Sequence, residues 1–276
     1  MPRVRSIPES FDAAAVGEID DLLRAVAVEH GVAIPLAVES GSRAWGFPSP
    51  DSDYDCRFVY VRPARHYLTP WLPRDVIEHA PAGLLDVNGW DVRKAVALLV
   101  KGNAVILEWL TSPVVYGGDE RLRAELLALA DRVTDRAAVG RHYLHVGRSQ
   151  RARFLLPDGR IPRKKLFYAV RPALALHWLR EHPAAVVPPM HLAGLLAAVP
   201  VPDDVRAAVD ELVAAKAATR ELGLAAIPSP LAAYLEAQLA TEPWLDARPD
   251  AATVARARRD ATDVFRRTVR THAPPD

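Results

Sequence analysis

The sequence has little of what would stabilise a secreted protein or anchor one in a membrane. It contains one cysteine, Cys56, so no internal disulfide can form, and such a chain fits a reducing compartment. No uninterrupted apolar stretch approaches the ~20 residues that span a bilayer. The amino-terminal residues Met-Pro-Arg-Val-Arg also lack the apolar core of a signal peptide. We therefore expect a cytoplasmic protein without membrane contact.

Three common catalytic signatures are absent as well. The sequence has no phosphate-binding loop of the form G-x-x-x-x-G-K-[ST], no protein-kinase signature and no G-x-S-x-G nucleophile elbow. If the protein binds phosphates, it must therefore do so with a shorter element. The composition is otherwise ordinary: half of the 276 residues are hydrophobic and a quarter are charged, which is enough for one large or two modest globular domains.

The most informative segment combines a glycine-serine turn with two acids. Gly41-Ser42 follows an apolar run, and Asp53 and Asp55 follow about ten residues later in a β-type segment. Alternate residues of a strand share a face, so the two carboxylates point the same way and repel each other unless a cation lies between them. Oxygen ligands of this kind favour Mg²⁺ or Mn²⁺. A glycine-serine turn that starts a short helix offers backbone N–H groups to a phosphate, with the Ser42 hydroxyl as one more donor.

In this order and spacing, the segment resembles the nucleotidyltransferase superfamily that includes DNA polymerase beta, whose signature is hG[GS] followed by [DE]h[DE]h. The longer string from Gly41 to Phe58 is similar to one branch, the bacterial and phage polymerase-beta-like proteins assigned to an RNA-repair pathway. The resemblance runs from about residue 36 to residue 116, with a looser match at residues 163–180. It implies nucleotidyl transfer from an NTP, with RNA as the acceptor.

The resemblance also implies a third acid on a neighbouring strand, because two-metal transfer in this superfamily usually uses three carboxylates. The candidates are Asp86 and Asp91. We favour Asp86, which lies within a strand pattern, because Asp91 stands where a helix begins and is explained by capping alone. Asp53, Asp55 and Asp86 are thus the predicted catalytic residues and ligands of two Mg²⁺ or Mn²⁺ ions, with Asp86 as base.

Several cations are candidates for holding the nucleotide. Arg43 follows Ser42 and could reach a triphosphate, and Arg57 shares the strand face of Asp55, where a structural ion pair is an equal alternative. Further along, Lys164, Tyr168 and Arg171 fall at i, i+4 and i+7 and share one helix face. They could contact the triphosphate and stack on a base or sugar, or simply present charge to water.

A basic segment supports a nucleic-acid partner. Residues 141–180 contain ten Lys or Arg against one acid, Asp158, and several aromatic residues. Cations interleaved with aromatic rings suit single-stranded nucleic acid, although a solvated helix with a packed aromatic face gives the same pattern.

The element pattern predicts an α/β nucleotidyltransferase domain with a mixed sheet over residues 1–118, followed by an all-α domain over residues 119–276. The predicted helices include residues 11–30, 91–101, 103–111, 120–130, 136–154, 163–181, 191–198, 203–222, 229–240 and 251–272. Pro172 is expected to kink or split the helix over residues 163–181. Two alternatives to transfer onto RNA remain: transfer to a small molecule or a protein side chain, and a non-catalytic nucleotide- or RNA-binding module.

Overall fold

The computed structural model describes residues 3–79, 83–220 and 222–275. Its contacts divide the chain into two compact units. Unit 1 comprises the described residues of Met1–Ala44, Asp53–Thr134 and Pro249–Asp276, and unit 2 comprises Trp45–Ser52 and the described residues of Asp135–Arg248. The predicted fold class is confirmed, because a mixed α/β region precedes a largely helical carboxy-terminal part. The predicted division at residue 118 into a catalytic and a helical domain stays a prediction.

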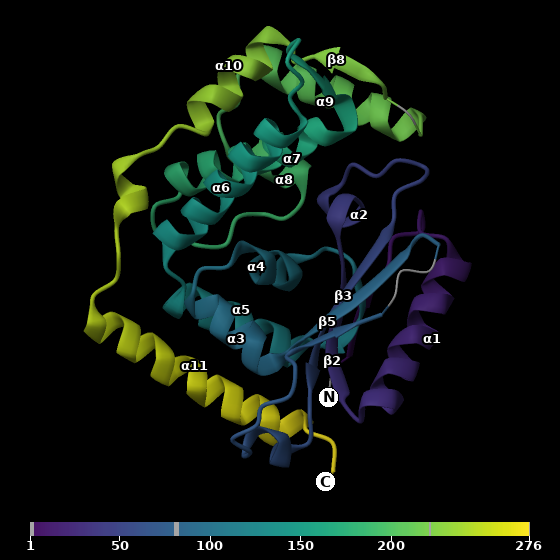
Figure 1. The fold of residues 1–276 in the computed structure, drawn as a ribbon, viewed down its shortest axis with the longest axis vertical. Helices are drawn as coiled ribbons and strands as arrows, with labels where there is room; N and C mark the ends of the chain where they lie inside the picture. The colour runs from purple at the N-terminus through teal and green to yellow at the C-terminus, as the bar shows by residue number, and fades with distance from the viewer. Residues whose placement is uncertain (1–2, 80–82, 221, 276) are drawn as a thin grey trace. The chain divides into compact units, whose positions relative to one another are not determined.

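Unit 1 is built on a six-stranded mixed sheet (Figure 1). Its strands, in spatial order, are β1 (Arg3–Ser6), β6 (Val115–Asp119), β2 (Ala33–Ser40), β3 (Tyr54–Val61), β5 (Leu85–Asp91) and β4 (Val76–Glu78). The pair β3 and β5 is parallel, and the other neighbours are antiparallel. This order places the predicted acids of β3 and β5 on adjacent strands near the middle of the sheet.

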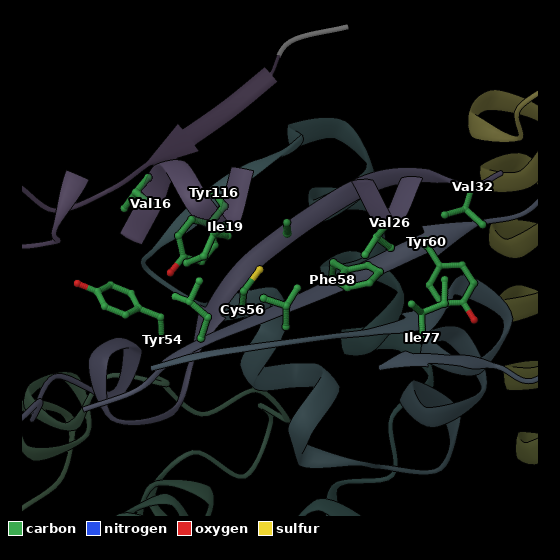
Figure 2. Close-up of a cluster of buried hydrophobic side chains, with 13 residues drawn as sticks. Val16, Ile19, Val26, Val32, Tyr54, Cys56, Phe58, Tyr60, Ile77 and Tyr116 are labelled. Atoms are coloured by element: carbon green, nitrogen blue, oxygen red, sulfur yellow. The ribbon is translucent and has the colours of Figure 1, made fainter. Parts of the chain in front are cut away.

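Helix α1 (Ala13–His30) covers one face of the sheet. Alternation along β3 turns Tyr54, Cys56, Phe58 and Tyr60 to this side, where they form one buried cluster with apolar residues of α1 (Figure 2). The side chain of Cys56, the single cysteine of the sequence, is fully inaccessible in this cluster. Because these residues turn towards α1, the intervening residues of β3, including Asp55, face the opposite side.

Four helices of unit 1 pack on the strands or on one another away from α1. Helix α3 (Val92–Val100) contacts β3 and β5, α4 (Ala104–Thr111) contacts β2, and α5 (Glu120–Val133) contacts β6. The last helix, α11 (Ala251–His272), packs against α3 and α5. The sheet is therefore enclosed between helices, as its apolar strands require.

Unit 2 is mainly helical. Its elements are α6 (Arg136–Phe154), β7 (Arg160–Pro162), α7 (Arg163–Glu181), α8 (Leu192–Ala198), α9 (Asp203–Ala218), β8 (Leu224–Ala226), α10 (Ser229–Gln238) and the 3-10 turn η2 (Pro243–Asp246). Helices α6 and α7 form the central pair, and α8 and α10 pack on α7. Strands β7 and β8 form a two-stranded antiparallel sheet, which the sequence pattern did not predict.

Some predicted element limits are wrong. Helix α1 begins at Ala13 with Asp12 as its cap, rather than at residue 11, because the Asp12 side chain accepts from the N–H of Ala14. Helix α9 ends at Ala218, since Thr219 is already extended. Helix α7 is continuous through Pro172, so the helix does not split there, and the predicted kink stays a prediction. In the described part of the chain, none of the helices has both the length and the apolar character of a membrane span.

Candidate active site

The register of the central strands brings two of the predicted acids side by side. Residue Asp55 of β3 is the ladder partner of Asp86 in the parallel strand β5. On its other side, Asp55 is opposite Ser40, the last residue of β2 before the glycine-serine turn. Asp53 lies just before β3 and is exposed. The turn and the three acids predicted from the sequence thus meet at one end of three adjacent strands.

Gly41 lies directly against the Asp55 carboxylate. It begins the short helix α2 (Gly41–Trp45) and has a left-handed φ of 61°. A Cβ atom at this position would come within 2.0 Å of the Asp55 Oδ2 atom. Both the backbone conformation and the contact therefore require glycine, which gives the glycine of the motif a physical reason.

Arg57 connects the two neighbouring acids. Its Nη2 atom lies 2.9 Å from Asp55 Oδ1 and 2.6 Å from Asp86 Oδ2. Its Nη1 atom donates to the backbone carbonyls of Asp86, at 2.8 Å, and of Cys56, at 3.1 Å. The Asn88 amide donates to the other oxygen of Asp86. Of the two alternatives for Arg57, the ion pair with the acids is thus present, and the predicted contact with a triphosphate stays a prediction.

The charge at this site is only partly balanced. Burial raises the pKa of the Asp55 carboxyl, the charge of Arg57 lowers it, and the charges of Asp86 and Asp53 raise it further. Within the described residues, no group of three or more acidic, histidine or cysteine side chains is arranged as a metal site. A cation of the protein itself, Arg57, stands between the two acids instead.

Glu39 is a site residue that the sequence interpretation missed. Its side chain is fully buried, its Oε1 atom accepts from the backbone N–H of Asp55 at 2.8 Å, and its Oε2 atom accepts from the Tyr116 hydroxyl. Burial raises the pKa of Glu39 to about 8. The sequence does contain a signal for Glu39: it is a lone acid at the end of the apolar run before Ser40-Gly41. Burying an acid in such a strand is costly, so its presence there indicates a specific role.

Asp91 has the capping role that the sequence indicated. It caps α3 by accepting from the N–H of Arg93 at 2.8 Å, and its carboxylate also accepts from the Tyr67 hydroxyl at 3.2 Å. It pairs across the ladder with Tyr60, five positions beyond the partner of Asp86. An odd spacing along a strand puts Asp91 on the other face from Asp86, so only Asp86 accompanies Asp55.

Arg43 contacts the segment that carries the first acid. Its Nε atom donates to the Asp53 carbonyl at 3.1 Å, and its guanidinium lies 3.8 Å from the centre of the Tyr54 ring. Ser42 is half-buried beside it in α2. The predicted contacts of Ser42 and Arg43 with a triphosphate stay predictions.

The three predicted nucleotide-binding residues of α7 share one face and contact a single segment of unit 2, Trp45–Ser52. Lys164 pairs with Asp51 at 3.1 Å, the Tyr168 ring meets the Trp45 ring edge-on, and the Arg171 guanidinium lies 4.9 Å from that ring. Arg171 is only 4% exposed and donates from Nε to the Met190 carbonyl. These side chains hold the stretch that joins Ser42 to Asp53 in the sequence, and their contact with a nucleotide stays a prediction.

Several other cations of the basic segment bind protein groups. Arg148 donates from Nε to the Leu239 carbonyl at 2.8 Å, and Arg141 donates to the carbonyls of Leu245 and Ala247. Arg180 forms an ion pair with Glu242 at 2.9 Å. These bonds attach residues 238–248, which lead into α11, to α6 and α7. A high density of arginine here therefore has a structural use as well as the predicted RNA-binding one.

A mixed sheet in which a glycine-serine turn meets paired acids is the arrangement expected of a polymerase-beta-like protein. Residues 17–267 match the model of the RNA repair pathway DNA polymerase beta family (RlaP). A relative in Bacillus subtilis (strain 168), which carries the name "Uncharacterized protein YcgL", is 36% identical over 221 residues, covering 80% of this chain and 84% of the relative. The chain belongs to the RNA repair pathway DNA polymerase beta family, as the resemblance of its motif indicated.

Proposed function

We propose that the protein is a divalent-metal-dependent nucleotidyltransferase that moves a nucleoside monophosphate from an NTP to an acceptor hydroxyl on RNA. The observation that carries the proposal is the pairing of Asp55 with Asp86 across parallel strands, with Gly41 against the Asp55 carboxylate. Membership in a polymerase-beta family supports the reaction type.

The acids suit a divalent cation. Asp53, Asp55 and Asp86 offer carboxylate oxygens, which Mg²⁺ and Mn²⁺ prefer. Neighbouring strands are about 4.8 Å apart, so Asp55 and Asp86 can share one cation, and they already share the guanidinium of Arg57. We propose these three acids as the ligands of two Mg²⁺ or Mn²⁺ ions. When bound, such ions would lower the pKa of the attacking hydroxyl and stabilise charge on the triphosphate.

The proposed reaction is a displacement at the α-phosphorus. Asp86 accepts the proton of the acceptor hydroxyl, whose oxygen forms a bond to the α-phosphorus. The bond from this phosphorus to the bridging oxygen breaks, and its electron pair leaves with pyrophosphate. Gly41 leaves room beside Asp55, the Ser42 hydroxyl donates to a phosphate oxygen, and Arg43 offsets part of the triphosphate charge.

RNA is the proposed acceptor for two reasons. The description of the family to which the chain belongs names an RNA-repair pathway. The segment over residues 141–180 also contains ten Lys or Arg against one acid, and cations of this density attract a phosphate backbone.

The test is label transfer from each α-³²P-labelled NTP with Mg²⁺ or Mn²⁺, with and without total RNA. We expect label in RNA from the wild-type protein and none from an Asp53→Asn/Asp55→Asn variant. Asp21→Asn is the matched control, because Asp21 is an exposed acid of unit 1 that pairs with Arg24, three residues further along the same helix. Label on the protein or on a small molecule would replace RNA as acceptor, and nucleotide binding without any transfer would replace the enzyme by a binding module.

A further inference from the structure

Arg57 occupies the position between Asp55 and Asp86 that a shared metal ion would need. One nitrogen, Nη2, contacts both carboxylates, at 2.9 Å and 2.6 Å. The Arg57 side chain is only 17% exposed, and those of Asp55 and Asp86 are 26% and 32% exposed. Water therefore screens these pairs less than it screens surface pairs. A divalent cation that takes the position of Nη2 between the two carboxylates must displace these contacts.

The other half of the guanidinium has a different attachment. Nη1 donates to the backbone carbonyls of Asp86 and Cys56, at 2.8 Å and 3.1 Å. Neither bond involves a carboxylate, so both can persist when Nη2 gives up the acids. The fork geometry of arginine thus lets one nitrogen stay attached to β3 and β5 while the other exchanges its partners.

We propose that Arg57 is an internal counter-cation that competes with the divalent metal for Asp55 and Asp86. It holds the two acids together in the metal-free protein, and metal binding releases its Nη2 atom from both of them. This inference rests on the proposed function, since it assumes that these acids are metal ligands. Arg57, on the same strand as Asp55 and two positions from it, thus limits the affinity of the site for metal.

The direct test measures Mn²⁺ binding to the purified protein without nucleotide. The electron paramagnetic resonance signal of free Mn²⁺ gives the amount that is not bound. We expect Arg57→Gln to bind Mn²⁺ about tenfold more tightly than wild type, a change of about 1.4 kcal/mol. Arg57→Lys keeps the charge but lacks the two-nitrogen fork of arginine. Its Mn²⁺ affinity should lie between those of wild type and Arg57→Gln. Arg74→Gln is the matched control, because it removes the same charge from an exposed pair with Glu78 in unit 1.

Thermal unfolding supplies a second readout that does not depend on activity. Without metal, Arg57→Gln leaves two adjacent carboxylates without their cation, so its melting temperature should lie below that of wild type. Added Mn²⁺ should raise the melting temperature of Arg57→Gln more than that of wild type, because the ligand binds the folded state more tightly. Equal metal-induced shifts would contradict the competition.

The outcomes separate this inference from the proposed function. Unchanged or weaker Mn²⁺ binding by Arg57→Gln, with binding by wild type intact, would overturn the competition and leave the metal site standing. Absence of Mn²⁺ binding in wild type and in Arg57→Gln would overturn both. Binding that survives the Asp55→Asn change in the Arg57→Gln background would place the metal elsewhere and would also overturn the inference.

Discussion

Glu39 should make the stability of the protein fall as the pH rises, and Glu39→Gln should remove this dependence. The carboxyl is fully buried and joins the backbone N–H of Asp55 to the Tyr116 hydroxyl. Burial is the main reason that its pKa rises from 4.5 to about 8. At neutral pH the group is therefore mostly protonated in the folded protein and ionised in the unfolded chain. A glutamine amide has the shape of the protonated acid and can still accept from Asp55.

The direction of this pH dependence follows from the difference in bound protons between the folded and the unfolded state. Between pH 4.5 and about 8, the unfolded chain binds fewer protons at this residue than the folded protein does, so the free energy of unfolding falls as the pH rises. The contribution of Glu39 is fully present below pH 4.5 and is lost by about pH 8. The slope is at most about 1.4 kcal/mol per pH unit, because a single carboxyl exchanges at most one proton.

The assay is urea unfolding of wild type and Glu39→Gln at pH 5.5 and pH 7.5. We expect the stability of Glu39→Gln relative to wild type to rise by about 2 kcal/mol between the lower and the higher pH. Other titrating groups are common to both proteins and cancel in the difference. Glu78→Gln is the control, because it makes the same chemical change at an exposed acid. A difference that stays constant between the two pH values would refute the reasoning.

Two further changes test the site and its surroundings. Gly41→Ala should lower the free energy of unfolding by about 1–2 kcal/mol, because alanine is strained in the left-handed backbone conformation, and it should also displace Asp55 and abolish label transfer. Gly31→Ala is the control, because Gly31 has a φ of 58° and nothing within 4 Å of an added Cβ. It should show the same loss in urea unfolding but keep label transfer. Lys216 is buried against the Phe47 ring, and burial, followed by the charge of a neighbouring lysine, lowers its pKa from 10.5 to about 8. Its folded state thus loses stability as the pH falls through this window, and Lys216→Met should be more stable than wild type at pH 7 by about 1–3 kcal/mol in urea unfolding, with the gain shrinking towards pH 10.

The sequence predicted best what depends on neighbouring residues. The helices over residues 136–154, 163–181 and 251–272 have the predicted limits, because apolar periodicity and capping acids are local signals. The glycine-serine turn and the acids Asp53 and Asp55 are also a local signal, since their spacing alone predicts that the two carboxylates lie on one side. The choice of Asp86 over Asp91 as the neighbour of Asp55 followed from a capping argument of the same kind.

Strand β6 shows where such local signals fail. Gly117 and Gly118 lie within β6, between β1 and β2, where the sequence pattern predicts no strand. Glycine is a poor strand former by itself. Here the close approach of Leu36 leaves little room for a larger side chain at Gly118, whose Cβ would lie 3.0 Å from the Leu36 side chain. A contact between residues so distant in the chain leaves no trace in a local pattern.

The arginines of α6 show the same limit for function. Arg141 and Arg148 belong to the basic segment for which RNA binding and a solvated helix face were both open, and in the structure both donate to backbone carbonyls of residues 238–248. Density of charge along a helix cannot distinguish a cation that meets solvent from one that meets a carbonyl a hundred residues away. Tests of RNA binding therefore need arginines such as Arg153, which is exposed on the same helix, as well as those that attach the segment.

Charge balance at the acids depends on register in the same way. Two acids at positions i and i+2 predict a cation between them, and the sequence interpretation took this cation to be a divalent metal ion. The parallel pairing of β3 with β5 adds a third acid beside Asp55, and the same register brings Arg57 within reach of both Asp55 and Asp86. This sequence thus carries, two residues after Asp55, the arginine that neutralises the two neighbouring acids. The repulsion between the Asp55 and Asp86 carboxylates is therefore offset by a cation that belongs to the same strand as Asp55.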